Sequence, residues 1–181
     1  PNGGREENQL SETALVRQCV SKSDKHWWAN HYLRWGIIRL DGRSRFNLTN
    51  DQQTGDLLSA PQNVLAHLFQ DDAARTKARA LIYEAFGMYF VVDPTNLGYL
   101  RIRLSQEEPT PDEQSLNLNA RAFHRKAIHI KDASDGMQAY SGIITAVLSG
   151  EFHTILIDEP EAFLHPPLAR KLGKHLAALV T

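Results

Sequence analysis

The sequence predicts an α/β fold in which helices flank a sheet and an antiparallel β element accompanies it. Apolar residues recur at helical spacing in several stretches, and two β-rich runs flank the turn sequence at 93–98. A short aliphatic strand at 153–157 then leads into a helix, which is the repeating unit of an α/β sheet. The 181 residues suffice for one domain with a sizeable core.

The composition is typical of a soluble globular protein and excludes several other classes of protein. With 42% hydrophobic and 23% charged residues the chain has the profile of a soluble globular protein. It has no apolar run near the ~20 residues of a membrane span and no signal-peptide pattern, so we expect a cytoplasmic protein that has no membrane partner. The lone Cys19 excludes an internal disulfide or a cysteine zinc site. The net charge of -1 gives no global attraction to nucleic acid, so any such binding would be local.

The first half of the chain is expected to contain helices, one strand, a turn and a polar loop. The expected order is a helix at 7–22, a strand at 35–40, a turn at 41–46, a polar loop at 48–62 and a helical stretch at 63–87. The helical stretch should break at Asp71-Asp72 and stop near Gly87, because these residue types favour helix caps.

The second half continues with strands and helices in alternation. The expected order is antiparallel strands at 88–95 and 99–105, a solvated acidic connector at 106–117, helices at 120–130 and 137–150, a buried strand at 153–157 and a helix at 166–180. The last helix carries one apolar face, made of Leu168, Leu172, Leu176 and Leu179 or Val180.

Two adjacent carboxylates, Asp158 and Glu159, follow the aliphatic strand directly. Nucleotide hydrolysis uses such a pair, since the Asp can hold Mg²⁺ while its neighbour positions or deprotonates the attacking water. The carboxyl end of a strand in an open α/β sheet is where ligands collect. The alternative is a strand that ends in surface acids and a turn proline, and the motif alone does not decide between the two.

A second motif, at 132–142, contains the start of the apolar helix that comes before the aliphatic strand. Ser134, Gly136 and Gln138 lie at the start of the helix, where a hydroxyl and exposed backbone N–H groups can bind an anion. The alternative, which the segment alone favours, is a plain N-cap by Ser134 or Asp135 for a helix that starts at Gly136 or Met137.

Together, "SDGMQ" and "ILIDEPEAFLHP" resemble the signature, Walker B and D-loop series of ABC-type P-loop ATPases. The resemblance is closer to the branch of SMC, RecF and OLD-like proteins, the "AAA family ATPases", in which Asp-Glu-Pro-Glu-x-x-Leu-His-Pro is typical. It implies one P-loop NTPase domain over 1–181, incomplete at both ends. Its parts would be a P-loop side at 1–60, a helical and β insertion at 61–131, and the signature helix, Walker B and D-loop at 132–181.

The resemblance also implies roles for individual residues. Asp158 would hold Mg²⁺, and Glu159 would be the general base or would position the water. Ser134 and Gly136, with Gln138 beside them, would contact the γ-phosphate of ATP bound to a second ATPase subunit. His165 would occupy the D-loop position, where many transporters carry an aspartate, and the switch histidine would lie beyond Thr181.

The N-terminus resembles the beginning of a P-loop. Family P-loops often run Gly-Pro-Asn-Gly-x-Gly-Lys-Ser/Thr, and the matching residues here are Asn2, Gly3 and Gly4 after Pro1. Arg5-Glu6-Glu7 stands where the lysine and hydroxyl should follow, and an acidic pair would repel phosphates. Either residues between Gly4 and Arg5 are absent from the sequence as it stands, which we favour, or the P-loop is degenerate.

Three further groups of residues have a functional and a structural interpretation. The Arg39, Arg43 and Arg45 group beside Phe46 could sense nucleotide or contact DNA phosphate, but a solvated arginine turn is favoured. Trp27, Trp28, Tyr32 and Trp35 could stack on bases, but packing is favoured. His124 and His129 are expected to be partly exposed helix residues.

These observations predict an ATPase that uses ATP and Mg²⁺. Hydrolysis would be coupled to dimerisation or conformational change that regulates an effector such as a nuclease, with DNA as a further partner, in DNA repair or anti-phage defence. One alternative is a catalytically inactive scaffold that binds a partner protein. A Mg²⁺-dependent nuclease that uses Asp158 and Glu159 directly is disfavoured, because the chain lacks further clustered acids.

Overall fold

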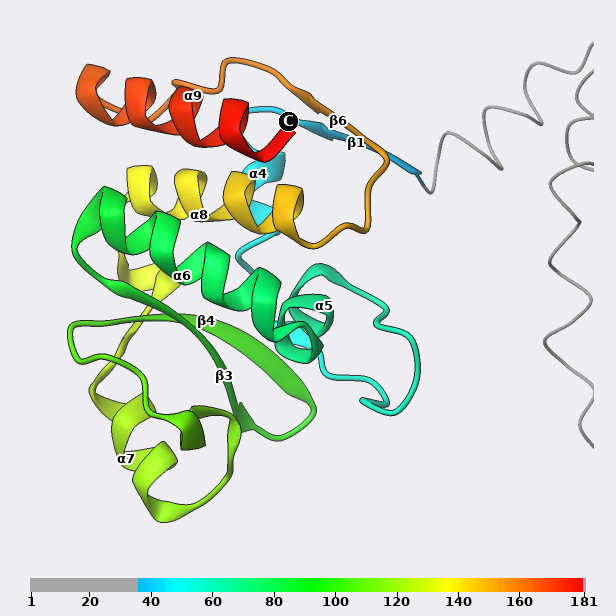
Figure 1. Cartoon of the computed structure of the whole chain (residues 1–181), viewed down its shortest axis with the longest axis vertical. Coiled ribbons are helices and arrows are strands. Elements are labelled where there is room, and N and C mark those ends of the chain that lie inside the picture. The colour runs from blue at the N-terminus through cyan, green and yellow to red at the C-terminus, as the bar shows by residue number, and fades with distance from the viewer. Residues whose placement is uncertain (1–35, 181) are drawn as a thin grey trace, which may run out of the picture. The chain divides into compact units, whose positions relative to one another are not determined.

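The computed structural model describes residues 36–180, which form two sheets and the helices around them (Figure 1). The elements are β1 (Ile37–Leu40), α4 (Ser44–Asn47), β2 (Gln52–Gln53), α5 (Val64–Gln70), α6 (Asp72–Phe86), β3 (Tyr89–Asn96), β4 (Tyr99–Ser105), η2 (Pro111–Gln114), α7 (Leu118–Lys126), β5 (Ile128–His129), η3 (Ile130–Asp132), α8 (Asp135–Leu148), β6 (Thr154–Ile157) and α9 (Pro166–Val180). The predicted helix at 7–22 and the aromatic residues at 27–35 lie outside the described residues.

The first sheet joins strands that are far apart in the sequence. β1 and β6 are hydrogen-bonded neighbours in parallel orientation, and the Asp158 N–H donates to the Leu40 carbonyl at 2.8 Å where both strands end. In the second sheet β4 is central and antiparallel to β3, with β2 and β5 pairing to other parts of β4. The predicted α/β class, with a helix-flanked sheet and an antiparallel element, is confirmed.

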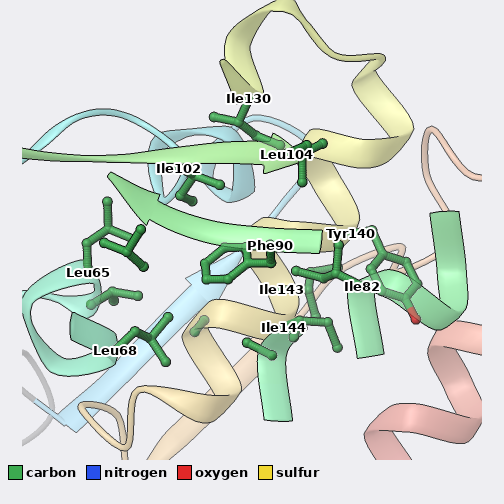
Figure 2. Close-up of a cluster of buried hydrophobic side chains, with 14 of the residues drawn as sticks. Leu65, Leu68, Ile82, Phe90, Ile102, Leu104, Ile130, Tyr140, Ile143 and Ile144 are labelled. Atoms are coloured by element: carbon green, nitrogen blue, oxygen red, sulfur yellow. The ribbon is translucent and has the colours of Figure 1, made fainter. Parts of the chain in front are cut away.

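The core lies between the antiparallel sheet and the helices stacked on it. α6 covers the β3–β4 hairpin, and α8 lies between α6 and α9 (Figure 1). Figure 2 shows the buried cluster, to which α5, α6, β3, β4, η3 and α8 all contribute. Its labelled members are Leu65, Leu68, Ile82, Phe90, Ile102, Leu104, Ile130, Tyr140, Ile143 and Ile144. Burial of this cluster therefore fixes α8, the helix that carries the predicted signature residues.

Capping residues set the helix boundaries as predicted. Asp71 ends α5 and caps α6, since its carboxylate accepts from the Ala74 N–H at 2.9 Å. Gly87 ends α6 with φ +67°, a left-handed conformation that favours glycine. The predicted hairpin is also present, with Gly98 at φ +86° in its turn.

Two segments predicted as loops contain regular structure. The polar loop at 48–62 includes β2, which pairs with β4. The connector at 106–117 is not simply solvated, because it contains η2 and the buried Glu113. Glu113 accepts from Arg79 on α6 at 2.5 Å, and Arg75 lies 3.4 Å from the same oxygen. A buried carboxylate needs such partners, and they come from a distant helix.

Three other predictions are wrong in part. The helix expected at 120–130 ends at Lys126, because Ile128 and His129 leave the helix to pair with β4. His124 is buried and its Nε2 lies 2.7 Å from the Glu113 carbonyl, whereas we expected partial exposure. The strand at 153–157 is not buried, since only Ile155 and Ile157 pack against the core and Leu156 is exposed.

α9 has the extent that its pattern indicates, whereas α8 begins and ends about two residues before the predicted 137–150. On α9, Leu168 and Leu172 are buried, and Leu176 and Leu179 are partly buried against the core. No helix among the described residues is both long and apolar enough to cross a bilayer.

A close approach between α4 and α8 depends on Gly142. A Cβ built on Gly142 would lie 2.2 Å from the Arg45 carbonyl oxygen, closer than two such atoms can approach, and 3.6 Å from Cγ2 of Thr49. Only glycine therefore lets the turn that carries Arg45 rest on α8.

Gly142→Ala is expected to lower the free energy of unfolding by about 2 kcal/mol, because the backbone of α4 must move away from α8. The matched control is Gly173→Ala on α9, where nothing lies within 4 Å of the added Cβ. That change should be neutral or stabilise the protein by up to ~1 kcal/mol through helix propensity. Urea denaturation of both variants measures the difference, and equal effects would contradict the close approach.

Candidate active site

Asp158 and Glu159 lie at the carboxyl ends of the parallel strands β1 and β6. Both side chains are exposed at this edge of the sheet. Glu159 has φ +48°, a left-handed conformation that costs a residue with a Cβ about 1–2 kcal/mol. A strained residue that directly follows a strand is a feature of functional sites, where the surrounding contacts maintain the strain.

The Asp158 carboxylate is suitable for binding Mg²⁺. It is a hard oxygen donor, and its ion pair with Arg39, at 3.0 Å, joins side chains that are 56% and 68% exposed. Such exposed pairs contribute little, so the pair leaves the carboxylate accessible to a cation. The described residues hold no group of three or more His, Cys, Asp or Glu arranged for a metal. Mg²⁺ in nucleotide sites needs only one or two carboxylates, with phosphates and water as the other ligands.

A buried arginine supports the backbone of this pair. Arg45 is fully buried, and its Nη2 donates to the carbonyls of Asp158 at 2.6 Å and Glu159 at 3.0 Å. Its Nε donates to the Asp41 carbonyl at 2.9 Å. The favoured prediction of a solvated arginine turn is therefore wrong for Arg45. Its guanidinium is hydrogen-bonded to the carbonyls of Asp158 and Glu159, more than a hundred residues away, and not to solvent.

Asp41 shapes the turn that carries this arginine. Its carboxylate accepts from the backbone N–H groups of Ser44 at 2.8 Å and Arg43 at 2.9 Å. These bonds lower the pKa of Asp41 from 3.8 to about 2. Burial lowers the pKa of Arg45, while the charges of Asp41 and the nearby glutamates act in the opposite direction. The guanidinium therefore stays charged at neutral pH.

The loop between Glu159 and α9 is folded by its own backbone. The Ala162 N–H donates to the Glu159 carbonyl, and the Leu164 N–H donates to the Glu161 carbonyl, both at 2.9 Å. Phe163 has φ +69°, and its ring packs edge-on against Phe46 of α4 with centroids 5.1 Å apart. The loop is thus held to the same α4 turn as the two carboxylates.

The start of α8 lies against this loop. Ser134 caps the helix, since its hydroxyl oxygen accepts from the Met137 N–H at 3.3 Å, and α8 begins at Asp135. The predicted N-cap is thus present, while the exposed Ser134 retains its O–H as a donor. A Cβ on Gly136 would lie 2.9 Å from the Phe163 carbonyl oxygen, so a tight backbone contact also requires this glycine.

The remaining predicted site residues lie around this centre or outside the described part. Gln138 folds back on its own helix start, where its Nε2 donates to the Ala133 carbonyl at 3.0 Å. His165 is exposed, and its backbone carbonyl accepts from Leu168 and Ala169 in the first turn of α9. Asn2, Gly3 and Gly4 lie outside the described residues.

A hollow of about 360 Å³ lies elsewhere, on α9. It is lined by Glu84, Pro167, Arg170, Lys171, Lys174 and His175, none of which was predicted to act in catalysis. The buried Tyr140 hydroxyl lies 2.5 Å from His175 Nδ1, and His175 Nε2 lies 3.1 Å from Glu84. These contacts tie α6, α8 and α9 together, so the polar residues here have a structural explanation. We therefore place the candidate site at the sheet edge.

Sequence reasoning singled out Asp158, Glu159, Ser134 and Gly136 but missed the support beneath them. It noticed Arg45 only as one of three arginines and did not consider Gly142. The position of Arg45 in the turn "DGRSRF" would become informative only with the pairing of β1 and β6 in hand. The pairing itself joins segments too distant for any local pattern to indicate.

One family model matches the chain, over residues 89–179, and its description is "AAA domain, putative AbiEii toxin, Type IV TA system". The match runs from β3 to α9 and so includes the 158–159 pair and the start of α8. An AAA domain implies the P-loop NTPase fold, which confirms the predicted fold class. No curated protein and no solved structure matches the chain.

Glu159→Gly is expected to give a higher free energy of unfolding than Glu159→Ala, by about 1 kcal/mol, because glycine adopts φ +48° without strain. At Glu161, where φ is not positive, the order should reverse, since glycine costs more backbone entropy. Thermal unfolding of the four variants checks both comparisons. Higher stability of Glu159→Ala than of Glu159→Gly would show that Glu159 is unstrained.

Proposed function

The chain belongs to the family described as "AAA domain, putative AbiEii toxin, Type IV TA system", and from this premise we propose that it is a Mg²⁺-dependent ATPase. AAA domains bind and hydrolyse nucleotides and in general use ATP and Mg²⁺. The proposal assigns these activities to particular residues: Asp158 binds the Mg²⁺ that accompanies ATP, and Glu159 is the general base for the attacking water. Asn2, Gly3 and Gly4 belong to the P-loop.

One observation carries the assignment of Glu159. Its backbone is held at φ +48° at the end of a parallel strand, with its carbonyl bonded to the fully buried Arg45. A surface turn has no need to maintain a strained glutamate on a buried charge. A general base needs such a fixed backbone, because its carboxylate must point at one position relative to the metal and the phosphate. The surface-turn alternative is therefore the weaker one.

The order of events on this chain follows from the two carboxylates. Asp158 would hold the Mg²⁺ at the sheet edge, and the ion would supply positive charge beside the phosphates, which would stabilise the charge that develops in the transition state. Glu159, one residue on, takes a proton from the water whose oxygen bonds to the γ-phosphorus, while the bond from that phosphorus to the β–γ bridging oxygen breaks and ADP leaves. The two carboxylates are assigned separate tasks, because one would hold the cation while the other must stay free to accept a proton.

We also propose the finer family placement and its consequences. The chain would form a single ATPase domain of the ABC type, in the branch of SMC, RecF and OLD-like proteins. Ser134 and Gly136, with Gln138 beside them, would face ATP bound to a second copy, and the His165 loop would lie at that interface. The exposure of Ser134 at a helix N-terminus supports this arrangement.

The physiological role we propose is control of an effector, such as a nuclease, by ATP-driven closure of the dimer. The toxin and toxin–antitoxin wording of the family description favours anti-phage defence over DNA repair. Contact with DNA would belong to the effector or to a local surface, since the net charge of -1 provides no general attraction.

Glu159→Gln in the full-length protein is expected to bind ATP with unchanged affinity and to hydrolyse it ~10²–10⁴ times more slowly, because the amide cannot accept the proton. The variant should also accumulate as a closed dimer in the presence of ATP and Mg²⁺. Steady-state hydrolysis and light scattering measure the two effects. Glu161→Gln, an exposed glutamate in the same loop, is the control and should keep wild-type turnover.

Unchanged turnover in Glu159→Gln would remove Glu159 from the mechanism. Absence of hydrolysis in the wild-type protein itself would favour the alternative of an inactive scaffold.

Mixing two inactive variants tests whether Ser134 acts on the partner's nucleotide. Ser134→Asp keeps the helix cap but places a negative charge against the phosphate, so it should be inactive, whereas Ser134→Thr keeps both cap and hydroxyl and should be active. Ser134→Asp mixed with Glu159→Gln should regain about a quarter of wild-type hydrolysis, because each mixed dimer has one site without either change. No recovery on mixing would place Ser134 and Glu159 at one site of the same chain, or outside catalysis.

A further inference from the structure

We propose that Arg45 is a positioning residue for hydrolysis, which holds the Glu159 carboxylate in place through the backbone of Asp158 and Glu159. The inference rests on the proposed ATPase function. It adds a residue from β1's side of the sheet, outside the segment 89–179 that the family model matches.

The contacts of Arg45 converge on two successive peptide units. Its Nη2 donates to the Asp158 carbonyl, within the Asp158–Glu159 peptide, at 2.6 Å and to the Glu159 carbonyl, in the peptide that follows, at 3.0 Å. The Glu159 carbonyl also accepts from the Ala162 N–H at 2.9 Å, and the Asp158 N–H donates to Leu40 at 2.8 Å. The backbone is thus held before, within and after the pair. With these atoms held, the remaining freedom of Glu159 is in its side-chain torsions.

Arg45 itself cannot move to follow the loop. Its Nε is bonded to the Asp41 carbonyl, and its own carbonyl lies against Gly142 of α8. Since α8 is part of the core, the guanidinium stands on a rigid support. A water molecule or a surface lysine at this place would lack these contacts and would not hold the two carbonyls in one position.

The residue type fits this role better than lysine would. A guanidinium has several donors in a rigid plane, so one group can bond the Asp41 carbonyl and two more carbonyls at once. Its charge also lies close to the acidic residues Asp158, Glu159 and Glu161, each of which favours the charged form of Arg45. An ammonium could reach only part of this set, and its bonds would not define the plane of the peptide.

Arg45→Lys tests the inference, alone and combined with Glu159→Gln, in the full-length protein with ATP and Mg²⁺. We expect the single variant to lose ~10- to 100-fold in kcat while its affinity for ATP changes less than ~3-fold, since nucleotide binding does not involve Glu159. In the Glu159→Gln background the same change should cost less than ~3-fold, because residues that act as a unit are not additive. Arg43→Lys, an exposed arginine two residues away, is the matched control and should keep wild-type kcat.

A structural role alone would give a different pattern. It would lower nucleotide affinity and kcat together, and its cost would be the same in both backgrounds. Either result overturns the inference, as does an unchanged kcat in Arg45→Lys. If Arg45→Lys does not fold, Arg45→Gln, which retains an amide donor without a buried charge, is measured in the same way. Failure of both to fold at low temperature assigns Arg45 to folding and also overturns the inference.

The same experiment separates this inference from the proposed function. Absence of hydrolysis in the wild-type protein would contradict the ATPase assignment. Normal hydrolysis that depends on Glu159 but is indifferent to Arg45 would contradict the positioning role only.

Discussion

The buried guanidinium of Arg45 is the constraint on which the candidate site depends. A charge removed from water requires polar partners, and here they are the carbonyls of Asp41, Asp158 and Glu159. The turn after β1 and the turn after β6 are therefore joined by one side chain at the point where the strands end. Gly142 permits this arrangement, since any larger residue would push the Arg45 backbone away from α8.

The same turn connects the two parts of the proposed ATP site. Phe46 follows Arg45 and packs on Phe163, whose carbonyl in turn lies against Gly136 at the start of α8. A movement of the loop that follows Glu159 would thus reach Ser134 through backbone contacts. In a protein that closes on a second copy, such a connection would let the γ-phosphate on one face affect the geometry of the carboxylates on the other.

The sequence is informative wherever the physical cause is local. Asp71 and Gly87 end helices through caps within a few residues, and the β3–β4 hairpin follows from a turn between β-rich runs. The Asp158–Glu159 pair and Ser134 are likewise visible in short motifs. The burial of charged residues could not be predicted in this way, because the partners of Glu113 and Arg45 lie 34 and 113 residues away in the sequence. No periodicity indicates these partners, so both segments look like solvated turns from the sequence alone.

The most direct test of the account is a structure of the full-length protein with Mg²⁺ and a non-hydrolysable ATP analogue. We expect Asp158 to face the metal, directly or through water, with Glu159 directed at the γ-phosphate and Arg45 still bonded to both carbonyls. Ser134 of a second copy should contact the same phosphate. A nucleotide bound away from the ends of β1 and β6, or a Glu159 carboxylate turned away from the phosphate, would contradict the account.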